Sequence, residues 1–137
     1  MSSSPTIEAT YVVDTHTLVW YLTNQPKLSR RALAIFQAAE RGETRLIISA
    51  IVLAELYFLH VKHRLFASFE QVFVRLAQEP HISLIAFAPE DVLEFAGDEA
   101  VPEMHDRIIV GLARRLSCPL ITKDESIRHS GLAPVVW

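Results

Sequence analysis

The 137-residue sequence contains a single cysteine, Cys118, so it cannot form an intramolecular disulfide bond. Small secreted domains that depend on disulfide bonds are therefore excluded as a class, and a reducing cytoplasm is the expected location. Residues 1–8 have neither a basic start nor an apolar segment, so we expect a short flexible tail rather than a signal peptide. Residues 9–137 are enough for a single domain with one core.

The sequence also lacks a hydrophobic run long enough to span a membrane. The longest apolar stretch, residues 46–61, is interrupted by Glu55 and His60, whereas a spanning helix needs about 20 apolar residues. Positive charge is scarce as well, because 13 lysine and arginine residues are outnumbered by 16 aspartate and glutamate residues. We therefore expect no membrane association, and a strongly basic surface that collects nucleic acid from solution is excluded.

The pattern of apolar residues predicts strands that alternate with helices along the chain. Strands are expected at 10–13, 45–49, 82–87 and 120–122, with an edge strand at 134–137. Helices are expected at 15–22, 30–41, 50–64, 69–79, 89–95, 105–116 and 125–129, and the apolar helix at 50–64 is expected to be largely buried. Strands joined by helices pair in parallel, and helices then cover both faces of the sheet. The predicted fold is a three-layer α/β/α sandwich with a central, mostly parallel sheet.

Two acids stand alone in apolar segments. Asp14 is the only formally charged residue from 9 to 26, and it follows the first predicted strand, at the edge where open α/β folds build their sites. Glu55 is the only formally charged residue from 46 to 61, in the middle of an apolar helix. An unpaired buried carboxylate is costly, so we expect Glu55 to meet a cation or a proton.

Two further acids, Asp106 and Asp124, lie where they could simply cap the helices that follow, and Asp14 could do the same. Asp124 nevertheless follows a strand, and Asp106 begins a helix that returns along the sheet, so these three acids map to one edge. Glu55 lies about 8 Å along its helix from the same edge. Carboxylates so close together repel one another by several kcal/mol per pair even at an effective dielectric of about 20, and a divalent cation removes that conflict.

The residue types favour magnesium or manganese over zinc as that cation. The candidate ligands are carboxylate oxygens, and the sequence has no Cys/His cluster with zinc spacing and no HExxH motif. A metal ion held by carboxylates can bridge a phosphate oxygen and activate a water molecule for attack at phosphorus. The pattern therefore indicates hydrolysis of phosphodiester bonds.

Three segments carry a family resemblance: VVDTHTLVWYL at 12–22, SAIVLAEL at 49–56 and HDRIIVGLARRLSCPLITKDESI at 105–127. They resemble the PIN domain, especially the toxin subunits of VapBC-type toxin-antitoxin pairs, over nearly the whole chain. The resemblance implies a Mg²⁺- or Mn²⁺-dependent endoribonuclease whose metal-binding acids are Asp14, Glu55, Asp106 and Asp124, with Thr122 supporting the pocket. It also implies an RNA substrate, a homodimer and inhibition by a small antitoxin protein.

The other charged residues near these acids are expected to be solvated, with two exceptions. We expect Lys123 to bind substrate phosphates, and Glu103 is a candidate accessory acid. The solvated set is Arg107, Arg114, Arg115, Asp98 and Glu99. His16, where many PIN domains carry serine or asparagine, is interpreted as a hydrogen-bonded structural residue rather than a general base.

The apolar residues 19–22 leave two interpretations open. A short helix cannot turn all four side chains toward one core, so they could form a protein interface, and burial against neighbouring helices is the alternative.

Two other classes of α/β domain with an acidic site fit the sequence less well. A haloacid-dehalogenase phosphatase needs a second aspartate at the position of His16, and a phospho-receiver domain needs an aspartate after its third strand, where Ala88 and Pro89 stand. Both are disfavoured. The remaining alternative is a non-catalytic module of the same fold that binds RNA or a protein partner.

Overall fold

The computed structural model describes residues 9–137, so the tail predicted at 1–8 lies outside the described residues. The elements in chain order are β1 (Ala9–Val13), α1 (Thr15–Leu22), α2 (Arg30–Glu40), β2 (Thr44–Ser49), α3 (Ala50–His63), α4 (Phe69–Gln78), β3 (Ile82–Ile85), the 3₁₀ helix η1 (Pro89–Gly97), α5 (Met104–Leu116), β4 (Leu120–Ile121), α6 (Glu125–Ser130) and β5 (Val135–Val136). Each predicted element is present, with its ends within two residues of the prediction.

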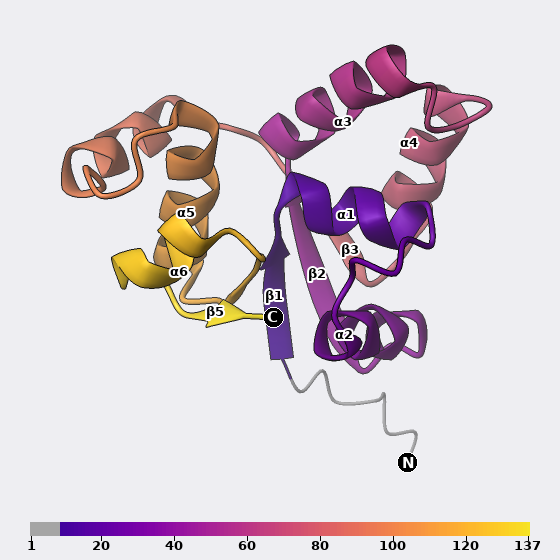
Figure 1. The fold of residues 1–137 in the computed structure, drawn as a ribbon, viewed down its shortest axis with the longest axis horizontal. Helices are drawn as coiled ribbons and strands as arrows, with labels where there is room; N and C mark the ends of the chain where they lie inside the picture. Colours follow the sequence, from indigo (N-terminus) through magenta and orange to yellow (C-terminus); the bar gives the residue numbers. More distant parts are fainter. Residues whose placement is uncertain (1–8) are drawn as a thin grey trace.

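The strands form one five-stranded sheet in the order β3-β2-β1-β4-β5, and all neighbouring strands are parallel. The chain winds outward from β1 to β3, then returns past β1 to form β4 and β5. Because crossover connections are right-handed, this reversal places α1 to α4 on one face and η1, α5 and α6 on the other, as Figure 1 shows. The predicted α/β/α sandwich with a parallel sheet is confirmed.

The reversal of winding also determines where a site can form. Connections from β1 and β4 leave the sheet toward opposite faces, which opens a crevice at the carboxyl ends of these two strands. Val12 and Val13 of β1 and both residues of β4 are fully buried, so the floor of this crevice is the centre of the core. Asp14 is the first residue after β1 and therefore stands at the crevice.

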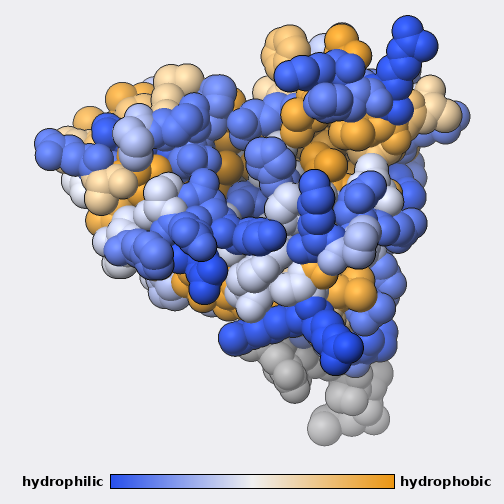
Figure 2. All heavy atoms as spheres, in the orientation of Figure 1, coloured by the Kyte–Doolittle hydropathy of each residue, from blue (hydrophilic) through white to orange (hydrophobic). Residues whose placement is uncertain are grey.

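The helix α3 is not largely buried, and that prediction was wrong. Only Val52 and Leu56 of this helix are buried, whereas Tyr57, Phe58 and Val61 are 46%, 69% and 58% exposed. In Figure 1, α3 and α4 extend as a pair beyond the carboxyl edge of the sheet, so the end of α3 has no sheet beneath it. Figure 2 shows hydrophobic side chains on the surface of this end of the molecule.

The apolar residues of α1 are packed within the chain. Val19 is buried, and Tyr21 stacks on Phe36 of α2 with a centroid distance of 4.1 Å. Trp20 contacts Trp137 edge to face at 5.7 Å. This packing favours burial over the interface interpretation. None of the helices between residues 9 and 137 is long and apolar enough to cross a membrane.

Candidate active site

A cleft of about 580 Å³ opens at the carboxyl edge of the sheet. It lies between α1, α3, the start of α5 and the loop that precedes α6. Its lining residues are Asp14, Thr15, His16, Thr17, Trp20, Glu55, Glu103, Asp106, Ile109, Lys123, Asp124 and Glu125. The structure therefore brings all four predicted acids to one cleft, together with Lys123 and Glu103.

Asp14 forms the buried base of the cleft. Its carboxylate caps α1 by accepting a hydrogen bond from the Thr17 backbone N–H at 2.9 Å. Only 9% of the residue is exposed, and burial raises the pKa of Asp14 above its ordinary value despite hydrogen bonds from Thr122 and Thr17. Burial therefore opposes the charged form of Asp14 when no cation is present.

Thr122 connects two of the acids. It is fully buried, its side chain hydrogen-bonds to Asp14, and its Oγ1 accepts from the Asp124 backbone N–H at 3.0 Å. Asp124 in turn caps α6 by accepting from the Ile127 backbone N–H at 3.1 Å and from the Ser126 hydroxyl at 2.6 Å. Burial opposes the charge on Asp124, but these hydrogen bonds lower its pKa. The position of Thr122 fits the supporting role expected for it.

Capping and lining the cleft are not exclusive roles. Asp14 and Asp124 do both, because a helix that begins directly after a parallel strand has its N-terminus at the same edge. For Asp106 the capping interpretation was wrong. Glu103 is the cap of α5, and its carboxylate accepts from the Asp106 backbone N–H at 2.9 Å. The Asp106 side chain is left to line the cleft.

The repulsion expected among the acids is seen in the raised pKa of Asp106. The pKa of Asp106 is raised to about 6, mainly because the carboxyl group is buried. The negative charges of four other acids raise it further: Asp124, Glu103, Glu55 and Asp14. Asp106 is therefore close enough to the other three acids to be affected by their charges.

Glu55 reaches the cleft from the opposite wall. Its Oε1 accepts from the Thr15 hydroxyl at 2.7 Å, and its Oε2 lies 3.4 Å from Nδ1 of His105. The side chain is 30% exposed and accepts a hydrogen bond, so the expectation of an unpaired, buried carboxylate was wrong. The reason is the position of α3, whose exposed end extends past the sheet. His105, which also lies 3.2 Å from Glu103, was not anticipated as a neighbour of the site.

The cleft has the chemistry of a hard-cation site. Four carboxylates supply oxygen ligands of the kind that Mg²⁺ and Mn²⁺ prefer. Burial raises the pKa of both Asp14 and Asp106, with nearby carboxylates adding to the rise for Asp106, and a cation would favour the charged forms of both. Within residues 9–137, however, no group of three His, Cys, Asp or Glu side chains is arranged to hold a metal ion. Metal binding therefore requires the carboxylates to converge further than they do here.

Three arginines near the site are bonded to other parts of the chain rather than only solvated, which corrects the sequence expectation. Arg114 pairs with Glu94 and with Asp98, which is fully buried, and Arg115 pairs with Asp91. Arg107 donates to the backbone carbonyl groups of Val101 and Phe95. All three arginines fasten the segment 89–101 to α5, so Lys123 alone of the four basic candidates lines the cleft.

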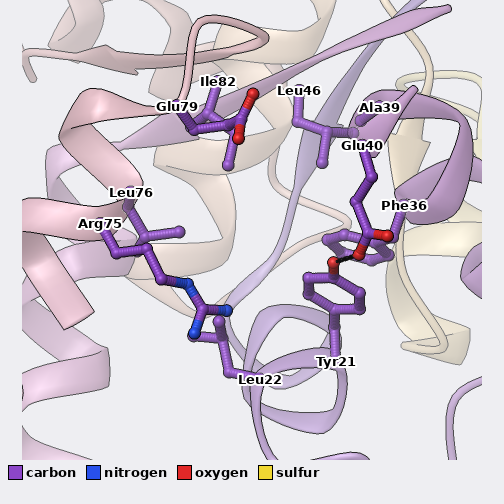
Figure 3. Close-up of a pocket in the computed structure, with 10 residues that line it drawn as sticks. All are labelled: Tyr21, Leu22, Phe36, Ala39, Glu40, Leu46, Arg75, Leu76, Glu79 and Ile82. Carbon is purple, nitrogen blue, oxygen red and sulfur yellow. Dashed lines mark hydrogen bonds between the residues drawn. The ribbon is translucent and has the colours of Figure 1, made fainter. Parts of the chain in front are cut away.

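A second cavity, of about 210 Å³, lies among α1, α2, α4 and the sheet (Figure 3). The Tyr21 hydroxyl donates to Glu40 on one side, and Arg75 and Glu79 lie on the other. Burial and Glu40 together raise the pKa of Tyr21. This cavity contains none of the four acids, so the cleft remains the candidate for catalysis.

The shifted pKa of Asp106 predicts how stability depends on pH. The folded chain binds the Asp106 proton more tightly than the unfolded chain, so this residue stabilises the fold below about pH 4, and the contribution is lost as pH rises through about 6. In chelator, we expect wild type to lose unfolding free energy relative to Asp106→Asn across this interval, on the order of 1 kcal/mol after screening by solvent. Urea denaturation of both proteins from pH 4 to 8 measures the difference, and parallel curves would contradict it.

Comparison with known proteins identifies the family and the fold. Residues 11–131 match the PIN domain family. The chain belongs to the PIN domain family. No curated protein sequence matches it.

Solved structures of PIN domains share its fold. VapBC2 from Rickettsia felis, bound to a DNA fragment from its promoter, aligns with a TM-score of 0.69 and 18% identity over 93% of this chain and 98% of that one. A toxin-antitoxin complex from Klebsiella pneumoniae aligns with a TM-score of 0.67 and 20% identity, over 93% of this chain and 96% of that one. The PIN domain endonuclease Utp24 aligns with a TM-score of 0.52 and 17% identity, over 93% of this chain and 80% of that one.

Proposed function

We propose that this PIN domain is an endoribonuclease that hydrolyses RNA phosphodiester bonds with Mg²⁺ or Mn²⁺. The observation that carries the proposal is the convergence of Asp14, Glu55, Asp106 and Asp124, from four separate parts of the chain, on one cleft in which the other three acids raise the pKa of Asp106. PIN domains are generally nucleases, and the similar Utp24 structure is that of an endonuclease. The catalytic unit is a single domain spanning 9–137.

Each side chain has a role that follows from its contacts. The four acids would hold the cation, which would supply charge neutralisation at phosphorus and a water of lowered pKa. Thr122 keeps Asp14 and Asp124 in fixed positions through its two hydrogen bonds. Lys123, on the rim between Asp124 and α1, would bind a phosphate oxygen of the substrate.

The biological setting is also proposed by similarity. The structures from Rickettsia felis and Klebsiella pneumoniae are of VapBC2 and of a toxin-antitoxin complex. We infer that this chain is a cytoplasmic, homodimeric toxin that is inhibited by a small antitoxin protein. Co-expression with the gene beside its own, followed by purification of the complex, tests the partner.

One observation favours a second function, a non-catalytic module that binds RNA or a protein through the same fold. In the described part of the chain the acids are not arranged to hold a metal ion. A module of this kind would bind RNA without cutting it, whatever metal is present.

The deciding experiment is incubation of purified wild type with a mixed RNA pool in chelator, in Mg²⁺ and in Mn²⁺. We expect internal cleavage in either metal and none in chelator. An Asp106→Asn variant purified in the same way controls for contaminating ribonuclease. Intact RNA in both metals, with RNA binding retained, would support the non-catalytic module instead.

A further inference from the structure

One wall of the cleft is aromatic rather than acidic. His16 and Trp20 are four residues apart on α1 and so lie on the same side of the helix, with ring centroids 6.0 Å apart. His16 is exposed and Trp20 is half-buried, and both line the cleft together with the four acids. An aromatic wall beside a phosphodiester-cleaving site is a place where a nucleobase can stack.

Trp20 is held in place by its neighbours. Its ring contacts Trp137 at 5.7 Å with an interplanar angle of 64°, and Nζ of Lys123 lies 5.8 Å from its centroid. A side chain that is already fixed loses little conformational freedom when a ligand binds to it. The same contact places the positive charge of Lys123 beside the indole, where it would attract the phosphate of a stacked nucleotide.

A further cavity of about 320 Å³ lies beside the cleft. This cavity shares His16 and Trp20 with the cleft, and its other lining residues are Val19, Thr23, Gln25, Lys27, Leu59, His63 and Leu65. It has no acid in its lining and contains Lys27 and His63, so its charge is opposite to that of the cleft. A polyanion that is repelled by uncompensated carboxylates is favoured on this side.

We propose that an unpaired nucleotide next to the cleaved bond stacks its base on Trp20, and that the RNA strand then passes His16 into the cavity that contains Lys27 and His63. The proposal rests on the ribonuclease function and specifies its substrate as single-stranded RNA. Bases in an A-form duplex are stacked on each other, so they cannot reach an indole in a cleft. Trp20 is then a residue that contacts substrate and positions the strand, in addition to packing on Trp137.

Binding can be tested without cleavage. The sequence has two tryptophans, so Trp137→Phe leaves Trp20 as the only indole fluorophore. In chelator, we expect a single-stranded oligoribonucleotide to quench the fluorescence of this variant, and a blunt RNA duplex of the same length to leave it unchanged. Binding that is detected by fluorescence anisotropy of labelled RNA, but without quenching of Trp20, would overturn the stacking proposal. This readout does not depend on whether the protein cuts RNA.

Cleavage kinetics provide the second test. Base stacking on an aromatic side chain is worth about 1–3 kcal/mol, so we expect Trp20→Leu to raise KM for single-stranded RNA by roughly 5- to 150-fold, whereas Trp20→Phe retains most of the affinity. Trp137→Leu is the comparison variant: it removes the packing partner but keeps Trp20 in the cleft, so we expect it to raise KM less than Trp20→Leu does.

Substrates with one abasic nucleotide locate the stacked base. We expect one abasic position beside the cleaved bond to slow wild type strongly and to have no further effect on Trp20→Leu. If wild type and Trp20→Leu respond identically at every position, Trp20 does not bind a base. If neither protein cleaves any substrate, the ribonuclease proposal fails, and the fluorescence experiment alone decides the stacking site.

A third test concerns the cavity that contains Lys27 and His63. Lys27→Gln is expected to weaken binding of single-stranded RNA in chelator and to reduce the salt dependence of binding by about one counterion. Arg31→Gln, at an exposed residue of α2 that lines neither cavity, is the control. Equal salt dependence for wild type and Lys27→Gln would show that the strand does not enter the cavity that contains Lys27 and His63.

Discussion

Replacing Asp106 by asparagine is expected to reduce metal-dependent RNA cleavage by more than about 100-fold while the fold is retained. Even residues that only orient a metal ligand typically contribute about 10- to 100-fold, and Asp106 is proposed as a ligand itself. Asp106 is the clearest position for this test, because Asp14 and Asp124 also cap helices, whereas the cap of α5 is Glu103. Asparagine removes the charge with little change in shape.

The measurement is the rate of cleavage in Mg²⁺ and Mn²⁺, together with the melting temperature with and without metal. Wild type should melt at a higher temperature in metal, since a ligand at about 100 times its Kd stabilises the fold by about 2.7 kcal/mol. Asp106→Asn should lose most of this increase. Glu70→Gln, at an exposed acid in the first turn of α4, is the control for loss of one negative charge. Unchanged cleavage by a folded Asp106→Asn protein would remove Asp106 from the site.

The acids could be found from the sequence because of where they stand relative to apolar segments. Asp14 and Asp124 follow buried strands, and in a parallel sheet the ends of such strands meet at one edge. Local patterning was therefore sufficient to predict the strands, the sandwich and the four acids in one cleft. It could not predict how far the carboxylates converge, because this depends on side-chain positions set by hydrogen bonds to Thr15, Thr17 and Ser126.

The environment of Glu55 was predicted less well, for a physical reason. An apolar helix can be buried in a core or can present apolar side chains at a surface, and its composition is the same in both cases. Only the three-dimensional arrangement shows that α3 extends beyond the sheet, with Phe58 mostly exposed and Glu55 partly accessible.

The arginines of α5 were misinterpreted because their partners are distant in sequence. Asp98 and Glu94 precede Arg114 by 16 and 20 residues, and the short helix predicted at 89–95 gave no indication that it packs on α5. Charged side chains on a helix are usually solvated, and the sequence alone gave no reason to expect otherwise. The fold brings a 3₁₀ segment onto α5, where backbone contact is close enough that a Cβ at Gly111 would lie 3.0 Å from Cβ of Glu94.

The contact between this segment and α5 leads to a large expected effect on stability. We expect Arg114→Ala to lower the free energy of unfolding by about 3 kcal/mol and the melting temperature by roughly 10 °C. Asp98 is fully buried, and the guanidinium of Arg114 contacts both of its carboxylate oxygens, at 2.6 and 3.1 Å. Removing the arginine leaves a buried carboxylate without its cation, and the loss is at the low end for such pairs because the Arg114 side chain is 34% exposed.

A double-mutant cycle separates the ion pair from the rest of the contact. Arg114→Ala combined with Asp98→Ala should be less destabilised than the sum of the two single variants, because no buried carboxylate is left unpaired, and Glu94, the other partner of Arg114, is 35% exposed. Arg41→Ala is the matched control, since its pair with Glu43 has side chains that are 59% and 49% exposed and contributes little. Strictly additive effects, or equal losses for Arg114→Ala and Arg41→Ala, would show that the pair does not fasten the segment. The same segment leads into Glu103, the cap of α5, so loosening it should also reduce RNA cleavage at temperatures below the melting transition.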